Sequence, residues 1–157
     1  MSAVGIRHVS LPDMVKSLVA DFRKTAPDTV FSLKLGWLEQ SFDDATKTTI
    51  RRCLQESITN ALRHGRAKSI EIEVSGVANV ADPNGSVLLL TVRDDGRGIS
   101  SAAPFGLGLT GMTERVNALG GTIPNYPRKQ GGTEIEISLP FVAAEKPRRA
   151  KSEAVTR

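Results

Sequence analysis

The chain is 157 residues long, which suits one domain with short tails, and 39% of its residues are hydrophobic. Charged residues make up 24%, so the composition excludes a fibrous or fully disordered chain. The formal net charge is +4, but the basic residues gather near the C-terminus and aromatic residues are only 4% of the chain. Platforms for base stacking are therefore scarce, and we expect no nucleic-acid binding.

The cysteine count and the lengths of the apolar runs indicate in which cellular compartment the chain is expected. Cys53 is the single cysteine, so no disulfide can form within the chain, which fits a reducing compartment. No apolar run approaches the ~20 residues of a membrane-spanning helix, and the first ten residues contain no signal-peptide core. We therefore expect a cytoplasmic segment without membrane contact, in a parent protein that could be membrane-anchored elsewhere.

The first half of the chain predicts a helix, a strand and a long helix. Ser10 is a suitable N-cap, apolar residues then recur at helical spacing, and Pro27 ends the first helix. Alternating apolar residues over 30–35 predict a strand. An apolar stripe over residues 43–64 predicts a long helix, which Gly65 ends.

The second half predicts four strands and one helix. Alternation predicts a half-buried strand, a continuous apolar run predicts a central strand, and the last strand alternates most clearly. Between these elements we expect a turn region and a glycine-rich loop. The strands are expected at 69–74, 87–92, 122–125 and 133–140, the helix at 109–119, the turn region at 77–86 and the loop at 94–105.

This order of elements predicts the fold. Short turns between adjacent strands imply a mixed, mostly antiparallel sheet, and helices on one face make a two-layer α/β sandwich. We expect residues 1–10 to be an N-terminal tail, residues 11–141 to form the domain, and residues 142–157 to be a disordered basic tail.

The long helix contains the first candidate site. Glu56, Asn60 and His64 are spaced four residues apart, so they share one side of the helix. A carboxylate and an amide oxygen on consecutive turns suit Mg²⁺, and the carboxylate could also orient or deprotonate an attacking group. Arg63 and His64 at the helix end could reach phosphate. Taken alone, the segment favours an ordinary surface stripe over a binding site.

The second candidate, V-R-D-D-G-R-G-I, directly follows the central strand. Asp94 at the strand end is a natural acceptor for an exocyclic amino group such as that of adenine. Gly96 and Gly98 would let a flat ligand approach the backbone closely. The alternative is a plain D-G turn, which the second glycine disfavours.

Two further glycine segments follow. The stretch Gly106-Leu107-Gly108-Leu109-Thr110-Gly111 opens a helix whose free N–H groups suit polyphosphate. It matches a dinucleotide fingerprint, but a loop separates it from the preceding strand, which argues against a Rossmann site. A P-loop motif is absent from the sequence. Gly131-Gly132-Thr133-Glu134 opens the last strand and presents a hydroxyl there.

In order and spacing, these segments resemble the ATP-binding domain of the GHKL superfamily, which includes gyrase, a heat-shock chaperone, a mismatch-repair ATPase and the histidine kinases. Within it, the sequence most resembles the histidine-kinase group typified by nitrate sensors and by the membrane-fluidity sensor of a fatty-acid desaturase. E-S-I-T-N-A-L-R-H resembles the N box, D-D-G-R-G-I and G-L-G-L-T-G-M-T-E-R-V the two glycine boxes, and G-G-T-E-I-E-I-S-L-P the closing strand. The resemblance spans residues 11–140.

The resemblance implies a Bergerat-type fold, ATP and Mg²⁺ as ligands, and a role for each motif residue. Asn60 would ligate Mg²⁺, and Glu56 would orient or activate through its carboxylate. Asp94 would accept from the adenine amino group, supported by Thr133. The remaining roles are phosphate contacts for Arg63 and His64, close approach to the base at Gly96 and Gly98, and a frame for the lid and phosphates at Gly106, Leu107, Gly108, Leu109 and Gly111.

Two departures from the family pattern matter. Asp95 stands where the family often has asparagine, and we expect no loss of function from it. The phosphoacceptor helix with its E-x-H-D-like motif has no counterpart, and His8 lacks such neighbours. We therefore expect a monomeric catalytic domain separated from its helices, which binds ATP and hydrolyses it slowly at best. Its partners would be histidine-bearing dimerisation helices and, through them, a response regulator.

Two alternatives stay open. A stand-alone GHKL kinase of the anti-sigma-factor type, which phosphorylates a serine on a partner protein, would share the same boxes. A nucleotide-gated binding module without catalysis is disfavoured, because Glu56 and Asn60 are both present.

Overall fold

The computed structural model describes residues 9–36, 38, 41–78, 81–82, 85–97, 109–123, 125–127, 131–141 and 152–153. Helices and strands follow one another in the predicted order as far as β5, and β6 is an addition. They are α2 (Leu11–Thr25), β1 (Val30–Gly36), α3 (Asp44–Arg63), β2 (Ser69–Ala78), β3 (Ser86–Asp94), α4 (Leu109–Ala118), β4 (Asn125–Pro127), β5 (Thr133–Phe141) and β6 (Ser152–Glu153).

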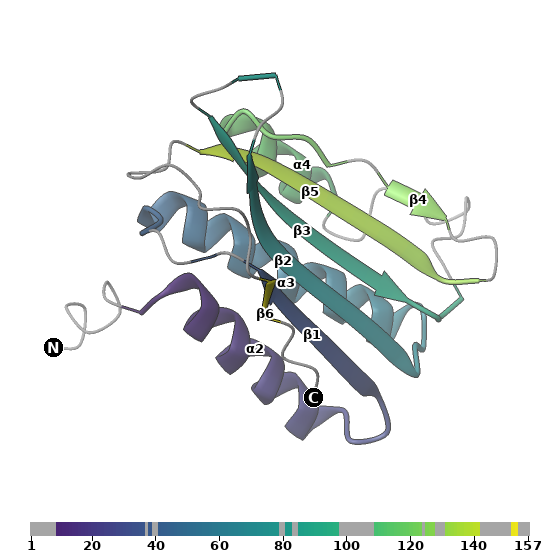
Figure 1. The fold of residues 1–157 in the computed structure, drawn as a ribbon. Coiled ribbons are helices and arrows are strands. Elements are labelled where there is room, and N and C mark those ends of the chain that lie inside the picture. The colour runs from purple at the N-terminus through teal and green to yellow at the C-terminus, as the bar shows by residue number, and fades with distance from the viewer. Residues whose placement is uncertain are drawn as a thin grey trace, which may run out of the picture.

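The described strands form one mixed sheet in the order β4-β5-β3-β2-β1-β6. Only β1 and β2 run parallel among its neighbouring pairs, and the other pairs are antiparallel. Figure 1 shows α3 behind the sheet with α2 beside it, and the helices contact β1, β3 and β5. The predicted two-layer α/β sandwich with a mostly antiparallel sheet is therefore confirmed.

The first helix begins at its predicted cap, and the second begins at Asp43, where its range was predicted to start. The Ser10 hydroxyl accepts a hydrogen bond from the Asp13 amide at 3.2 Å, with Pro12 in the first turn. The Asp43 carboxylate accepts from the Thr46 amide at 2.8 Å. Each cap satisfies an amide that the first helical turn leaves without a partner, so both helices start where the sequence predicts.

The core lies between the helices and one face of the sheet. Alternate residues of the four long strands are buried, and strand pairing places these residues in continuous rows, such as Ile72, Val92 and Ile135. The intervening residues of the same strands are half-buried or exposed. Because side chains alternate between the faces of a strand, one face is covered by helices and the other is open.

The strand boundaries differ from prediction where pairing continues beyond the apolar pattern. β2 reaches Ala78 and β3 begins at Ser86, and these two residues pair with each other inside the predicted turn region. β3 also continues to Asp94, which was expected to open a loop. Main-chain hydrogen bonds extend a hairpin without any apolar side chain, so hydrophobic alternation underestimates strand length.

The edge strands also differ from prediction. Instead of a strand at 122–125, Thr122 forms an isolated bridge with Ser138, and β4 begins at Asn125. β4 includes Pro127, which an edge strand tolerates because one side of its backbone needs no partner. Where the composition predicts a disordered tail, Ser152 and Glu153 form β6 against β1.

Candidate functional site

Asp94 ends β3 on the helix-covered face of the sheet. It is in phase with the buried residues Leu88, Leu90 and Val92, and it is itself only 7% exposed. Its Oδ1 atom accepts a hydrogen bond from the Gly96 amide at 2.9 Å. Asp is rarely buried unless it is paired, so this carboxylate marks a polar site at the edge of the core.

Thr133 begins β5 at the end of the sheet where β3 ends in Asp94. The β3–β5 ladder ends at the pair Arg93 and Glu134, the residues next to Asp94 and Thr133 in their strands. Thr133 is 6% exposed and in phase with the buried residues of β5. Gly132, with a φ of +94°, contacts the Asp94 carbonyl so closely that a Cβ there would overlap it.

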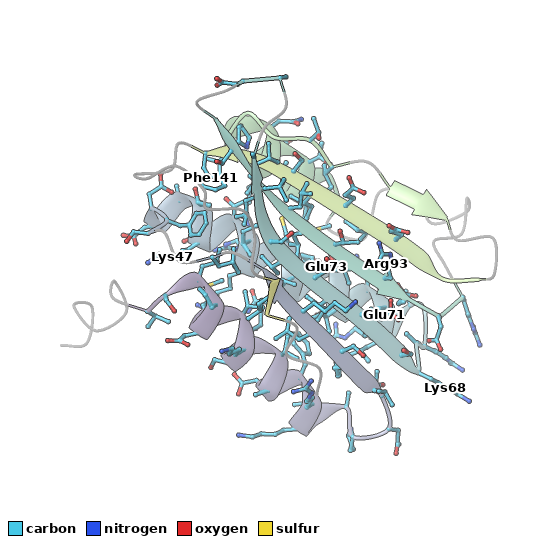
Figure 2. The ribbon with its side chains drawn as sticks, in the orientation of Figure 1. Lys47, Lys68, Glu71, Glu73, Arg93 and Phe141 are labelled. Carbon is cyan, nitrogen blue, oxygen red and sulfur yellow. The ribbon has the colours of Figure 1, made fainter. Side chains whose placement is uncertain are left out.

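The opposite face of the same ladder carries charged residues. Arg93 Nε lies 3.1 Å from Glu134 Oε1 across the two strands. Figure 2 shows Arg93 on the open side of the sheet with Glu71 and Glu73 of the neighbouring strand. Because adjacent residues point to opposite faces, Arg93 and Glu134 are only half-buried while Asp94 and Thr133 are buried.

The end of α3 is joined to the segment after β3. The Arg97 amide donates a 2.7 Å hydrogen bond to the Gly65 carbonyl oxygen. A Cβ added to Gly96 would lie 2.5 Å from the same oxygen, so glycine is needed here for close packing. This contact places the Asp94 segment beside the end of the helix that carries Glu56 and Asn60.

Asp95 has a structural role that the sequence did not indicate. Its Oδ1 atom accepts hydrogen bonds from the amides of Lys68 and Ser69, at 2.8 and 2.9 Å. The Asp95 amide in turn donates to the Ser69 carbonyl oxygen. These bonds fasten the start of β2 to the end of β3, next to the buried Asp94.

The four predicted residues of α3 follow one another along its length. Glu56 and Asn60 are half-buried, whereas Arg63 and His64 at the helix end are exposed. The Asn60 carbonyl oxygen accepts from both the His64 and Gly65 amides, which ends the helix. Exposure of these side chains therefore increases toward the end of α3, as expected for a site that opens to solvent there.

A family model described as histidine kinase-, DNA gyrase B- and HSP90-like ATPase matches residues 45–143. The chain belongs to this family. The match includes α3, β3 and β5, the elements that carry the Asp94 site. The observed fold and the family agree with an ATP-binding domain of the histidine-kinase type.

Individual relatives of this ATPase domain are sensor kinases. The chain is 36% identical over 111 residues to the sensor histidine kinase YxjM of Bacillus subtilis, covering 71% of this chain and 25% of YxjM. It is 29% identical over 133 residues to the histidine-protein kinase/phosphatase UhpB of Salmonella typhimurium, covering 84% of this chain and 25% of UhpB. The chain thus spans about a quarter of the length of these relatives.

Solved structures show the same fold at low sequence identity. A blue-light activated histidine kinase from Erythrobacter litoralis has a TM-score of 0.64 at 20% identity, covering 86% of this chain and 43% of that one. The ATP-binding domain of PrrB from Mycobacterium tuberculosis has a TM-score of 0.63 at 19% identity, covering 86% and 96%.

Part of the predicted glycine frame of this ATPase domain lies outside the described residues, namely Gly98, Gly106, Leu107 and Gly108. Leu109 begins α4, as predicted. Gly111 lies in α4 and is exposed, and a Cβ added to it would have no described atom within 4 Å. Steric crowding among the described residues therefore does not explain the glycine at position 111.

The donor set fits a magnesium–nucleotide complex better than a metal cage. The described residues include no group of three or more His, Cys, Asp or Glu that could hold a metal ion. Mg²⁺ typically takes one or two protein oxygens and completes its shell with phosphates and water. One carboxylate and one amide on α3, Glu56 and Asn60, meet that requirement.

Cys53 is fully buried one turn before Glu56. Burial raises the pKa of its thiol to about 11, with the Arg115 guanidinium of α4 acting in the opposite direction and the Glu56 carboxylate adding to the rise. A thiol held in its neutral form is a poor nucleophile, which agrees with a packing role.

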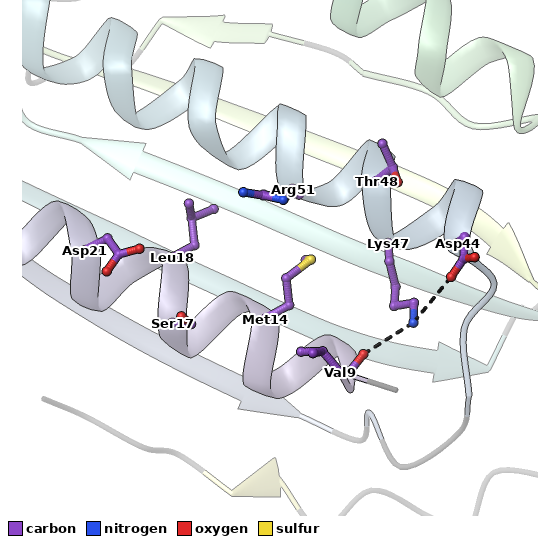
Figure 3. Close-up of a pocket in the computed structure, with 9 residues that line it drawn as sticks. All are labelled: Val9, Met14, Ser17, Leu18, Asp21, Asp44, Lys47, Thr48 and Arg51. Carbon is purple, nitrogen blue, oxygen red and sulfur yellow. Dashed lines mark hydrogen bonds and ion pairs between the residues drawn. The ribbon is translucent and has the colours of Figure 1, made fainter. Parts of the chain in front are cut away.

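A separate groove lies between α2 and α3 (Figure 3). Its volume is about 450 Å³, and none of the predicted site residues lines it. Lys47 Nζ spans one end, 3.3 Å from the Val9 carbonyl oxygen and 3.7 Å from Asp44 Oδ1. The lining residues are Val9, Met14, Ser17, Leu18, Asp21, Asp44, Lys47, Thr48 and Arg51.

None of the helices in the described part of the chain combines the length and apolarity that a bilayer crossing requires.

Proposed function

We propose that this chain binds ATP with Mg²⁺ and presents the γ-phosphate to a histidine on the dimerisation helices of a two-component sensor kinase, from which a response regulator takes it. The observation that carries the proposal is the junction between Gly65 and Gly96. It brings a buried acceptor, Asp94, beside the helix that carries Glu56 and Asn60.

The base end of the nucleotide is assigned to the sheet. Asp94 accepts a hydrogen bond from the adenine amino group, because a carboxylate has two acceptor oxygens and this one lies buried at the end of β3. Thr133, at the same end of the β3–β5 ladder, supports the same edge of the base. Gly96 and Gly98 allow the base to approach the backbone.

The phosphate end is assigned to α3 and the start of α4. Asn60 supplies an oxygen ligand to Mg²⁺, which when bound neutralises phosphate charge. Glu56 orients the acceptor histidine or accepts its proton, and Arg63 and His64 contact the phosphates. Gly106, Leu107, Gly108, Leu109 and Gly111 surround the phosphates at the N-terminus of α4, where free amides favour anions.

The finer grouping, with the nitrate sensors and the desaturase-controlling sensor, is also a proposal. The E-S-I-T-N-A-L-R-H and M-T-E-R-V segments support it. If this grouping is right, the phosphoacceptor is a histidine on the dimerisation helices. A kinase of the anti-sigma-factor type would instead phosphorylate a serine on a partner protein.

Calorimetric titration with ATP and Mg²⁺ tests the binding step. Asp94→Asn replaces one acceptor oxygen by a donor, and we expect ATP binding to be lost while circular dichroism shows a folded domain. Unchanged affinity in this folded variant would refute the assignment of Asp94.

Incubation with labelled ATP and separately supplied histidine-bearing helices tests the transfer step. We expect acid-labile label on the helices, and Glu56→Ala should lower transfer more than ATP affinity. Helices that stay unlabelled would favour the anti-sigma-factor type of kinase, whose acceptor is a serine on a partner protein. Equal losses of transfer and affinity would indicate that Glu56 is structural.

A further inference from the structure

The hydroxyl of Ser57 is buried without a hydrogen-bond partner. Ser57 is 2% exposed, and its Oγ is the one buried side-chain polar atom in the described part of the chain that has no partner. Native proteins satisfy nearly all buried polar groups, so an exception calls for an explanation. A ligand or an ordered water that occupies the site in the bound state is one such explanation.

The position of Ser57 points to a ligand. Ser57 is one of five polar or charged residues that are buried among those described, and Asp94 and Thr133 are two of the remaining four. Asp94 and Thr133 face the helices from the sheet, while Ser57 is on the buried side of α3, which packs on β3. Ser57 also adjoins Glu56 and precedes Asn60 by three residues, so it shares one side of the helix with Asn60.

We infer that the Ser57 hydroxyl is a third polar contact of the base pocket and hydrogen-bonds the purine base of the bound nucleotide. This inference rests on the proposed function and adds a base-contacting residue on the helix side. A contact through one ordered water is equivalent, since bridged hydrogen bonds are nearly as favourable as direct ones.

The base is a better partner for Ser57 than the phosphates. Ser57 carries a neutral hydroxyl on the buried side of α3, a helix that packs on β3, and Asp94 at the end of β3 is buried too and accepts from a base edge in the proposed pose. The exposed residues at the end of α3, Arg63 and His64, are the groups suited to phosphate contact. An uncharged base edge can enter a buried layer at far lower desolvation cost than a phosphate.

Titration of wild type and Ser57→Ala with ATP and with ADP tests the inference. We expect the variant to bind both nucleotides about three- to tenfold more weakly, as for loss of one neutral hydrogen bond. Without nucleotide, its melting temperature should equal or exceed that of wild type, because alanine favours the helix and an unpaired hydroxyl is removed. Ser57→Cys, which keeps the shape but donates weakly, should show a smaller loss of affinity.

Ser86→Ala is the matched control. It removes another buried serine hydroxyl, at the opposite end of β3 from Asp94, and should leave both affinities unchanged. Unchanged affinities in folded Ser57→Ala, or a loss for ATP without a loss for ADP, would overturn the inference. Failure of the wild-type protein to bind ATP would instead refute the proposed function, and the inference with it.

Discussion

Gly96 packs so tightly on Gly65 that a Cβ at position 96 would lie 2.5 Å from the Gly65 carbonyl oxygen. The same oxygen accepts the Arg97 amide at 2.7 Å. The two glycines are far apart in the chain, at the end of α3 and just after β3. Their contact joins the helical and strand parts of the proposed nucleotide site into one structure.

Gly96→Ala should therefore destabilise the domain and weaken ATP binding. The obstacle is backbone rather than a flexible side chain, so the end of α3 must move, at a cost of about 1–3 kcal/mol. Urea unfolding measures the stability and calorimetry the affinity. If alanine is accepted with neither loss, the contact does not hold the site together.

Gly111→Ala should have the opposite effect on stability. Gly111 lies inside α4 and a Cβ there meets no described atom within 4 Å, so alanine should stabilise the helix by about 0.5–1 kcal/mol. The same urea titration compares the two variants. A destabilised Gly111→Ala would reveal a close approach by residues outside the described part of the chain.

Asp95→Asn should be nearly neutral, whereas Asp95→Ala should cost about 1–2 kcal/mol of unfolding free energy. The Asp95 carboxylate acts as an acceptor for the Lys68 and Ser69 amides, and an asparagine oxygen can replace it. This explains why either residue could serve after the proposed adenine-binding aspartate. Equal stability of the alanine variant and wild type, by urea unfolding, would contradict this role.

The Asp43 cap should make stability depend on pH. Hydrogen bonds from the Thr46 side chain and the Thr46 amide hold the pKa of Asp43 below its ordinary value of 3.8. The ionised cap therefore contributes its full stabilisation to the folded state above pH 3.8. That stabilisation is lost as the pH falls through the lower pKa of the folded state. Asp43→Ala should cost about 0.5–2 kcal/mol at neutral pH and progressively less in acid.

Asp43→Asn is the matched control, because its amide oxygen caps without titrating. Thermal unfolding from pH 7 to pH 2 would measure the three proteins together. A stability gap between wild type and Asp43→Ala that stays constant down to pH 2 would rule out the carboxylate as its source.

The Cys53 thiol should resist alkylation in the folded protein. Its pKa is raised by burial from 9.0 to about 11, so at pH 8 the thiolate is about a hundredfold scarcer than in the unfolded chain. The raised pKa contributes stability below pH 9 that is lost as the pH rises toward 11. Labelling with iodoacetamide in increasing urea should follow unfolding, and rapid labelling without urea would show that the thiol is accessible.

Local sequence signals determined the helices, the order of the strands and the candidate residues. Caps such as Ser10 and Asp43 act within one helical turn, and apolar periodicity reports which face of an element is buried. The four motifs were readable for the same reason, since each lies within a dozen consecutive residues. Strand ends and edge strands were less predictable, because main-chain pairing imposes no side-chain pattern.

Only the tertiary structure decided which residues meet. Strand register pairs Arg93 with Glu134 and so brings Thr133 to the end of the ladder next to Asp94, and packing of backbone on backbone brings Gly96 to Gly65. The tertiary structure also brings the amides of Lys68 and Ser69 to the Asp95 carboxylate, and it leaves the Ser57 hydroxyl buried without a hydrogen-bond partner. Such relationships depend on the separation of groups distant in the chain, which periodicity and capping, being local, do not encode.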